Sequence, residues 1–269
     1  MTTNPNTRRA IIAAVAVVVV AGIALAAYLM GRSTTANPTP SPSVTVVPSS
    51  NSPSASYQPT DPNGSPEPGL PRGQAEAGAG GASAGPAGMP LGYSHDETGA
   101  VNAATNYLMW MNSLKIVDED TANELATASA TDETTRAALV ESFDALRPGM
   151  QEMTADQPEP ARGAYAVASY TPDRALIYIW SPEVMTDSSG QTEHVWGIDA
   201  VTVVWSDDDW KLDGGLITKT GAAAVDPIDP AFNPTAAEKH SILTRTPGDP
   251  GEITDSASQS WFEYANAPG

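Results

Sequence analysis

One carboxylate in an apolar stretch of the sequence has a position that suits proton transfer. Asp199 lies in the run 194–205, whose strand-like alternation places it on one face with Val201 and Val203. If that face lines a pocket, burial would disfavour the charged carboxylate and make it a stronger base. The alternative buries the opposite face, with Trp196, and turns Asp199 to water. Both faces are largely apolar, so the period does not decide between them.

The histidines and one acidic run are the remaining candidates for metal chemistry. His95, His194 and His240 are far apart in the sequence and form no H-x-x-x-H or H-x-x-E pair. The run Asp207-Asp208-Asp209 lacks the spaced oxygens and the distal glutamate of a calcium loop, and three acids of this kind are typical of a hairpin turn. We therefore expect no metal site.

Other catalytic signatures are missing from the sequence. There is no cysteine, which excludes a thiol nucleophile and a disulfide framework. No serine lies in a G-x-S-x-G elbow, and neither nucleotide-binding glycine motif is present. Asp199 also has no second acid, base or oxyanion donor that can be nominated beside it. The sequence thus predicts no catalytic residue, no cofactor and no enzymatic activity.

The charge of the chain is concentrated in its second part. Its 269 residues carry a net charge of −19, and no acidic residue precedes Asp61. A strongly acidic domain repels phosphate backbones, and no basic patch with interleaved aromatic residues is present. We therefore expect no nucleic-acid partner.

The N-terminal region predicts a membrane anchor. Residues 10–30 contain no charged residue, Asn, Gln or Pro, and as a helix they would span about 30 Å, the thickness of a hydrocarbon core. Arg8 and Arg9 precede this segment and only Arg32 follows it, so residues 1–9 should be cytoplasmic and the rest outside. The prediction is a single-pass protein of the cell membrane.

A cleavable signal peptide is the alternative for the same segment, with Ala24-Leu25-Ala26 as the cleavage site. The apolar run continues past that site to Met30 and is longer than a typical signal-peptide core, which favours retention. In both cases the remainder of the chain is exported.

Residues 31–90 predict a disordered linker. The segment from Ser33 to Pro90 holds twelve of the 24 prolines and consists mostly of Ser, Thr, Pro, Gly, Ala and Asn. Such a composition buries too little apolar surface to offset the entropy of ordering. We expect the linker to hold the domain away from the membrane.

Residues 91–224 predict an α+β domain. Three helices are expected first, beginning near Asp96 or Thr98, near Asp118, and near Thr131 or Asp132, with Pro148-Gly149 ending the third. Residues 151–162 are expected to form a loop. Four strand-like runs follow, at 164–170, 175–180, 194–205 and 209–216, and predict an antiparallel meander. This order indicates helices packed on one face of a curved sheet.

Residues 225–269 predict a turn-rich extension. Four X-Pro or Pro-Gly turns are followed by residues 257–264, which suggest a short docking helix. The aromatic residues Trp261, Phe262 and Tyr264 are expected to pack on the chain's own domain.

The succession of three helices and a meander resembles the nuclear transport factor 2-like superfamily over about residues 91–220. The hairpin from Val203 to Leu212, with Trp205 and Trp210 on either side of an acidic turn, is similar to hairpins of that superfamily. Gly92-Tyr93 and the run 99–107 resemble exported actinobacterial proteins, which are often associated with conjugation or secretion gene clusters. The resemblance implies a cone-like sheet and a scaffold role, as in bitopic components of type IV secretion and conjugation machines.

Two functions remain open at this stage. The first is a membrane-tethered interaction or scaffold domain whose partners are the membrane, through residues 10–30, and other membrane or cell-envelope proteins. The second is an exported small-ligand-binding or isomerase-like domain with a pocket in the sheet, in which Asp199 would be the residue of interest.

Overall fold

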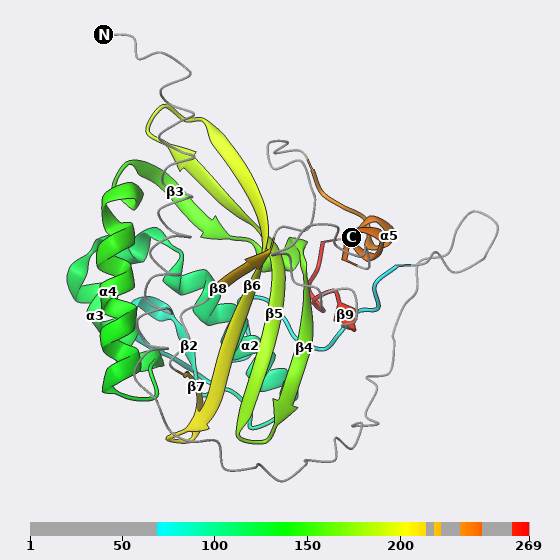
Figure 1. Cartoon of the computed structure of the whole chain (residues 1–269), viewed down its shortest axis with the longest axis horizontal. Helices are drawn as coiled ribbons and strands as arrows, with labels where there is room; N and C mark the ends of the chain where they lie inside the picture. Colours follow the sequence, from blue (N-terminus) through cyan, green and yellow to red (C-terminus); the bar gives the residue numbers. More distant parts are fainter. Residues whose placement is uncertain (1–68, 214–217, 222–231, 244–259, 269) are drawn as a thin grey trace, which may run out of the picture. The chain divides into compact units, whose positions relative to one another are not determined.

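The computed structural model describes residues 69–213, 218–221, 232–243 and 260–268. Over these residues the chain forms an α+β fold in which helices pack on one large antiparallel sheet (Figure 1). The predicted fold class is confirmed at this level. None of the described helices combines the length and the apolar character that crossing a membrane requires. The predicted anchor at 10–30, the tail before it and the linker up to residue 68 lie outside the described residues.

The elements follow the order helices, then strands, with short pieces at both ends. In chain order they are β1 (Ser83–Ala84), η1 (Pro86–Gly88), β2 (Pro90–Leu91), α2 (Glu97–Met111), η2 (Leu114–Val117), α3 (Glu119–Ser129), α4 (Glu133–Met150), β3 (Met153–Pro158), η3 (Pro160–Arg162), β4 (Ala164–Thr171), β5 (Arg174–Asp187), β6 (Thr192–Ser206), β7 (Asp209–Leu212), β8 (Thr218–Gly221), α5 (Ala236–Leu243) and β9 (Trp261–Phe262).

Three aspartates begin the three long helices. Asp96, Asp118 and Asp132 each accept a hydrogen bond from the backbone N–H three residues later, at 2.7 to 2.8 Å. Each carboxylate satisfies one of the N–H groups that the first turn of a helix leaves unpaired. The predicted starts of α2, α3 and α4 are therefore confirmed, with Asp96 rather than Thr98 as the first cap.

The end of α4 differs from the prediction. The helix passes Pro148-Gly149 and runs to Met150. Pro148 lies in the last turn and lacks only its own N–H, while the Gln151 N–H still donates to the Arg147 carbonyl at 3.0 Å. Met150 is buried in the core, so packing holds a turn that the proline alone would have ended.

The main sheet has the order β7-β6-β5-β4-β9. Two further strands belong to it: β3 pairs with β5, and β8 pairs with β6. All of these pairs are antiparallel, and β5 and β6 form the long central hairpin from Arg174 opposite Val204 to Thr186 opposite Thr192. The predicted runs at 164–170, 175–180 and 194–205 are confirmed as β4, β5 and β6. The fourth run begins at the predicted Asp209, and β7 ends at Leu212.

Residues 151–162 are a strand and a short helix rather than a loop. β3 pairs with the far half of β5, from Met153 opposite Asp187 to Pro158 opposite Glu183. In the described residues β3 has no strand on its other side, and a polar strand that contains proline is typical of such an edge. The sequence pattern did not predict β3, because an edge strand needs no apolar alternation and does not require each of its backbone N–H groups to pair with another strand.

The sheet carries a hydrophobic core on each face. Along β6, Val201 and Val203 pack against the helices, whereas Trp196 and Ile198 pack on the opposite side. We call these the helical face and the outer face. In Figure 1, α2 lies behind the sheet on the helical face. One alternative for β6 buried the face with Val201 and Val203, and the other buried the face with Trp196. Each is partly correct, because the structure covers both faces.

Residues 69–77, which we call the strap, belong to the packed domain. Leu70 is 5% exposed and packs in the outer core, and Ala75 is 1% exposed and packs in the helical core. These residues lie in the stretch 31–90 predicted to be disordered, so in the structure packing begins by Gly69 rather than near Leu91. The small residues that suggested disorder are the ones that let the strap lie close to its neighbours.

The C-terminal part of the chain docks as expected, in a different conformation. Trp261 and Phe262 form β9 against Ala166 and Tyr165 of β4, not a helix. Trp261 and Tyr264 are 3% and 0% exposed, which confirms the prediction that these aromatic residues pack on their own domain. The docking helix is α5, earlier in the chain, whose Leu243 is buried in the outer core.

Candidate functional site

Asp199 lies on the helical face and is 6% exposed. It stands opposite Ile179 in the β5–β6 ladder and lines a small hollow near the C-terminal end of α2. The remaining lining residues come from α2, the loop that follows it, β3, β5 and β6: Leu108, Asn112, Pro158, Ser181, Glu183, Val195 and Gly197. Of the two interpretations of the sequence, the one that placed Asp199 in a pocket of the sheet therefore identified the correct face.

The size of this hollow limits its chemistry. Its volume is about 10 Å³, which is room for about one water molecule. Small-molecule sites in proteins are clefts of several hundred Å³. A carboxylate beside a single water position has no space for a substrate, so the hollow does not favour the isomerase-like alternative.

The acidic run 207–209 divides into two turn residues and one buried anchor. Asp207 and Asp208 have positive φ angles of 54° and 59° and form the two-residue turn between β6 and β7. Asp209 is 6% exposed, and its carboxylate accepts hydrogen bonds from the N–H groups of Gly92 and Tyr93, both at 2.9 Å. The carboxylate therefore fixes the segment that leads into α2, a role that its position after a turn did not indicate.

Tyrosines near this anchor are held in their neutral form. Burial raises the pKa of Tyr93, and the nearby charge of Asp209 adds to the rise. Burial likewise raises the pKa of Tyr107, whose hydroxyl donates to the Trp210 carbonyl at 2.6 Å. Both phenols act as structural hydrogen-bond donors.

The three histidines occupy separate places. His95 stacks on Trp205 with ring centroids 3.9 Å apart, His194 is buried in β6, and His240 lies in α5. In the part of the chain that the structure describes, no three His, Asp or Glu side chains are grouped as metal ligands would be. The Arg162 guanidinium lies 3.3 Å from His194 Nδ1 and also donates to the Phe232 carbonyl at 2.7 Å. Arg162 thereby joins β6 to the segment before α5.

In the described residues, two ionic contacts meet on Glu263, where the strap lies beside the C-terminal segment. The Lys239 ammonium donates to Glu263 at 2.7 Å, with side chains only 3% and 8% exposed. The Arg72 guanidinium lies 3.9 Å from the second oxygen of Glu263 and donates to the Ala267 carbonyl at 3.3 Å. We call Arg72, Lys239 and Glu263 the clasp. The Lys239–Glu263 pair is buried, whereas the Arg72 side chain is 33% exposed. The buried pair is costly to break from one side, because a charge is then left without its partner.

Backbone bonds continue the clasp along the strap. The Gly73 N–H donates to the Glu263 carbonyl at 2.8 Å, and the Glu263 N–H donates to the Pro71 carbonyl at 2.9 Å. A Cβ at Gly73 would lie 1.8 Å from the Tyr165 hydroxyl, so only glycine fits. Through Glu263, β9 and then β4, the strap is connected to the main sheet.

Three asparagines hold the rest of the strap and the residues that follow it. Asn102 of α2 accepts from the Glu76 N–H at 3.0 Å, and Asn106 donates to the Ala79 carbonyl at 2.8 Å. Asn266 bonds both the N–H and the carbonyl of Ala77, at 3.1 and 2.9 Å. These amides bind the backbone of residues 76–79 rather than particular side chains, and we call the place between α2 and residues 263–267 that the strap fills the strap groove.

Sequence reasoning missed the clasp and the strap groove. Arg72 is separated from Lys239 and Glu263 by most of the chain, and no spacing rule joins any of the three. The signal that was available is compositional. Arg72 and Lys239 are two of only 13 basic residues in a chain with 32 acidic ones, so each is a candidate for a specific ionic contact.

Comparison with known proteins gives one match. A model of a domain of unknown function, DUF8175, matches residues 33–229, which is more than half of the chain. The match includes the strap, the helices and the main strands, and it ends before α5 and β9. No curated protein and no solved structure matches the sequence.

Proposed function

The chain belongs to the family of domains of unknown function DUF8175, and we propose that it is a membrane-tethered interaction domain that works outside the cytoplasm. In this proposal residues 10–30 are a single transmembrane helix, the residues that follow are a disordered linker, and the described domain binds other proteins of the membrane or cell envelope. A scaffold subunit of a conjugation or secretion apparatus is the specific form that the nuclear transport factor 2-like resemblance implies, with a cone-like sheet.

The observation that carries this proposal is the clasp. It lies where the chain enters the described domain from the side of the predicted linker. Its Lys239–Glu263 pair is buried, and backbone hydrogen bonds join the strap to Glu263, which follows β9. A tether that transmits force or fixes a domain in an assembly needs its point of attachment joined to the core. Here the attachment runs from Arg72 through Glu263 to the central sheet.

The hollow beside Asp199 supports the same choice. It has room for about one water molecule, whereas a small-molecule pocket needs several hundred Å³. The net charge of −19 suits protein partners with basic surfaces.

Fractionation of cells that make the full chain tests the proposal. We expect the protein in the membrane pellet after an alkaline wash, its domain cleaved by protease added from outside, and membrane proteins recovered with it after mild crosslinking. A matched variant that lacks residues 10–30 should remain in the soluble fraction. Recovery of the unaltered chain as a monomer in the medium would contradict the tether, and a membrane-bound protein that recovers no partner would contradict the interaction role.

A further inference from the structure

We propose that protonation of His194 releases the segment before α5 from the outer face of the sheet, so that this face responds to mild acid. The parts are His194 of β6, Arg162 of η3 and Phe232, which precedes α5. We call these three residues the acid switch. The inference does not depend on the proposed tether or on any partner, because each contact lies within the described domain.

The contact with Arg162 determines which form of His194 the fold accepts. Arg162 Nη1 lies 3.3 Å from His194 Nδ1, and because a guanidinium only donates hydrogen bonds, Nδ1 is the acceptor and the imidazole is neutral. The hydrogen of that neutral ring is then on Nε2, and a second proton binds Nδ1. Acid therefore competes with Arg162 for one lone pair. Protonation would leave two cations in contact beside a histidine that is only 8% exposed.

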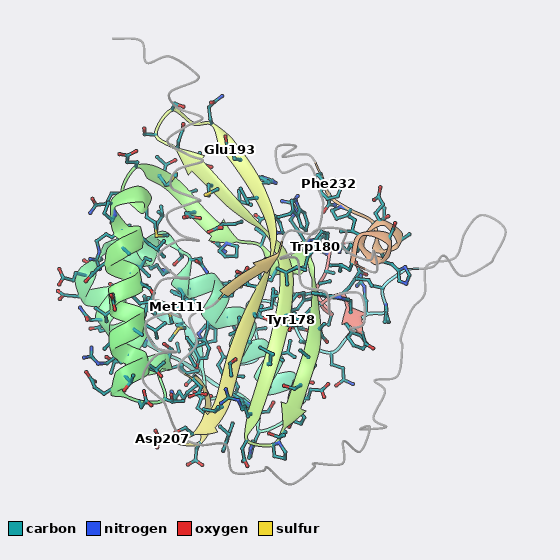
Figure 2. All side chains as sticks on the ribbon, viewed as in Figure 1. Met111, Tyr178, Trp180, Glu193, Asp207 and Phe232 are labelled. Atoms are coloured by element: carbon teal, nitrogen blue, oxygen red, sulfur yellow. The ribbon has the colours of Figure 1, made fainter. Side chains whose placement is uncertain are left out.

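The same guanidinium holds the segment before α5. Its Nη2 donates to the Phe232 carbonyl at 2.7 Å, and its carbon lies 5.9 Å from the centre of the Trp196 ring. The Phe232 ring meets Trp196 edge-on, with centroids 5.5 Å apart. Figure 2 labels Phe232 and Trp180 on the side of the sheet where α5 lies. If Arg162 turns away from a protonated His194, the Phe232 carbonyl loses this donor and Trp196 loses part of its cover.

The closed arrangement carries a cost that opening removes. Trp180 and Trp196 are 0% and 4% exposed, and within the described residues the indole N–H of each has no hydrogen-bond acceptor. A buried donor without an acceptor is unfavourable. Water that enters when Phe232 leaves supplies an acceptor to Trp196. The Arg162 contacts hold the segment closed against this cost, so their loss favours opening.

Other charged side chains come from the described elements around His194. They are Glu159 next to η3, Glu183 and Asp187 of β5, Glu193 of β6, and Glu238, Lys239 and His240 of α5. Glu183 lines the hollow on the helical face, and Glu193 alternates to the same face. Glu159 lies 2.8 Å from Arg162 Nη1, but its side chain is 42% exposed, so solvent screens its attraction for a protonated His194. Arg162 is therefore the group that opposes protonation.

The direction of the response follows from the form that the fold binds. Because Arg162 binds the neutral imidazole, the folded chain takes up a proton less readily than the unfolded chain does. The closed arrangement is complete above the ordinary titration range of histidine, about pH 6.5, and is lost as the pH falls below that range. Carboxylates titrate at about pH 4, so this change is separate from general acid unfolding.

Nuclear magnetic resonance of the full chain in detergent tests the switch. The histidine rings are labelled with carbon-13 and the tryptophan rings with fluorine, and both sets are followed while the pH is lowered from about 8 to about 5. The chain has three histidines, so His95→Gln and His240→Gln identify the His194 signal by elimination. Trp196→Phe identifies the signal of Trp196, and its shift between light and heavy water reports contact with solvent.

We expect the Trp196 signal to become sensitive to solvent as His194 is protonated, with a shared midpoint. The ratio of open to closed chains should rise by up to about tenfold per pH unit below about pH 6.5. His194→Gln is the matched variant, because its amide oxygen accepts from Arg162 but does not titrate, and its Trp196 should stay covered. Arg162→Met should expose Trp196 already at neutral pH. His95→Gln and His240→Gln should retain the transition.

Four results would overturn the switch. In the chain with natural His194 and Arg162, these are a His194 that stays neutral down to about pH 5 and a Trp196 signal that does not change while His194 is protonated. In the variants, they are a transition that persists in His194→Gln and a Trp196 that stays covered in Arg162→Met. The first two do not require either variant to fold.

Discussion

The helical face of the sheet is covered by α2, α3 and α4, which follow one another along the chain, whereas the outer face is covered by segments from both ends of the described chain. Each helix on the helical face begins at its own aspartate cap. On the outer face, Leu70, Leu243 and Trp261 come from separate segments that the clasp and β9 join to one another and to β4.

This difference shows how one domain combines two kinds of stability. The helical cover is the sum of many local contributions, and no single one dominates it. The segments that cover the outer face depend on the clasp, whose members come from the strap and from the C-terminal part of the chain. The family match includes the helices and the strap and stops before α5 and β9.

The largest effect should follow from breaking the clasp. Lys239→Met leaves Glu263 buried with only Arg72 near it, and we expect the free energy of unfolding to fall by about 3–5 kcal/mol. Urea unfolding followed by tryptophan fluorescence measures the change, since Trp180, Trp196 and Trp261 lie in the outer core.

Two further variants make this prediction specific. Lys239→Met combined with Glu263→Leu removes both charges and should recover most of the loss, because apolar pairs can replace buried ion pairs. Lys115→Met removes an exposed lysine above Trp110, outside the clasp, and should change stability by less than about 1 kcal/mol. A double variant as unstable as the single one would show that the charge itself is not what matters.

The two faces also differ in how far the sequence predicts them. The helical face was predictable because caps and apolar periods are local signals, and Asp118 and Asp132 were identified from them. The outer face was not, because the strap looks like linker until its contacts are known. Gly73 is a small residue of the kind that disordered chains also use, and its place beside Tyr165 and Glu263, which are remote in the sequence, is visible only in the structure.

The second effect concerns the anchor at the start of the helical face. Asp209→Asn retains one carbonyl oxygen but cannot accept from both Gly92 and Tyr93 as the carboxylate does. We expect a loss of about 1–3 kcal/mol and faster hydrogen exchange at these two amides, with little change at β9. Asp208→Asn, in the exposed turn beside it, should stay within about 0.5 kcal/mol. Equal losses in both variants would assign the effect to the turn.

The candidate chemistry was predictable only in part. Alternation identified the two faces of β6, and Asp199 does line a hollow on one of them. Its volume depends on how Leu108 of α2 and Pro158 of β3 fill the space, and side-chain packing between remote elements leaves no pattern in the sequence. The same limit applies to Asp209, whose partners lie more than 100 residues earlier.

A smaller effect, of opposite sign, is expected in the turn that closes the β6–β7 hairpin. Asp208 has a φ of 59°, a conformation that glycine adopts without strain, so Asp208→Gly should raise the free energy of unfolding by up to about 1 kcal/mol. The matched variant is Asp173→Gly in the β4–β5 turn, where φ is not positive, and there glycine should cost about 0.5–1 kcal/mol. Thermal unfolding of the two variants should shift in opposite directions, and a shared direction would contradict the argument.

The smallest effect concerns the response of the helical cover to acid. The backbone N–H of Thr135 lowers the pKa of Asp132 below its ordinary value of 3.8, so folding favours the ionised cap. Its contribution is complete above that ordinary value and is lost as the pH falls through the lowered pKa of the folded state. Asp132→Asn keeps an oxygen acceptor at the cap but cannot titrate. The stability difference between the natural chain and Asp132→Asn, measured by urea unfolding from pH 7 to pH 3, should therefore stay constant at first and change only below about pH 4. A difference that is already changing between pH 7 and pH 5 would mean that another group, and not the cap, carries the acid response of this face.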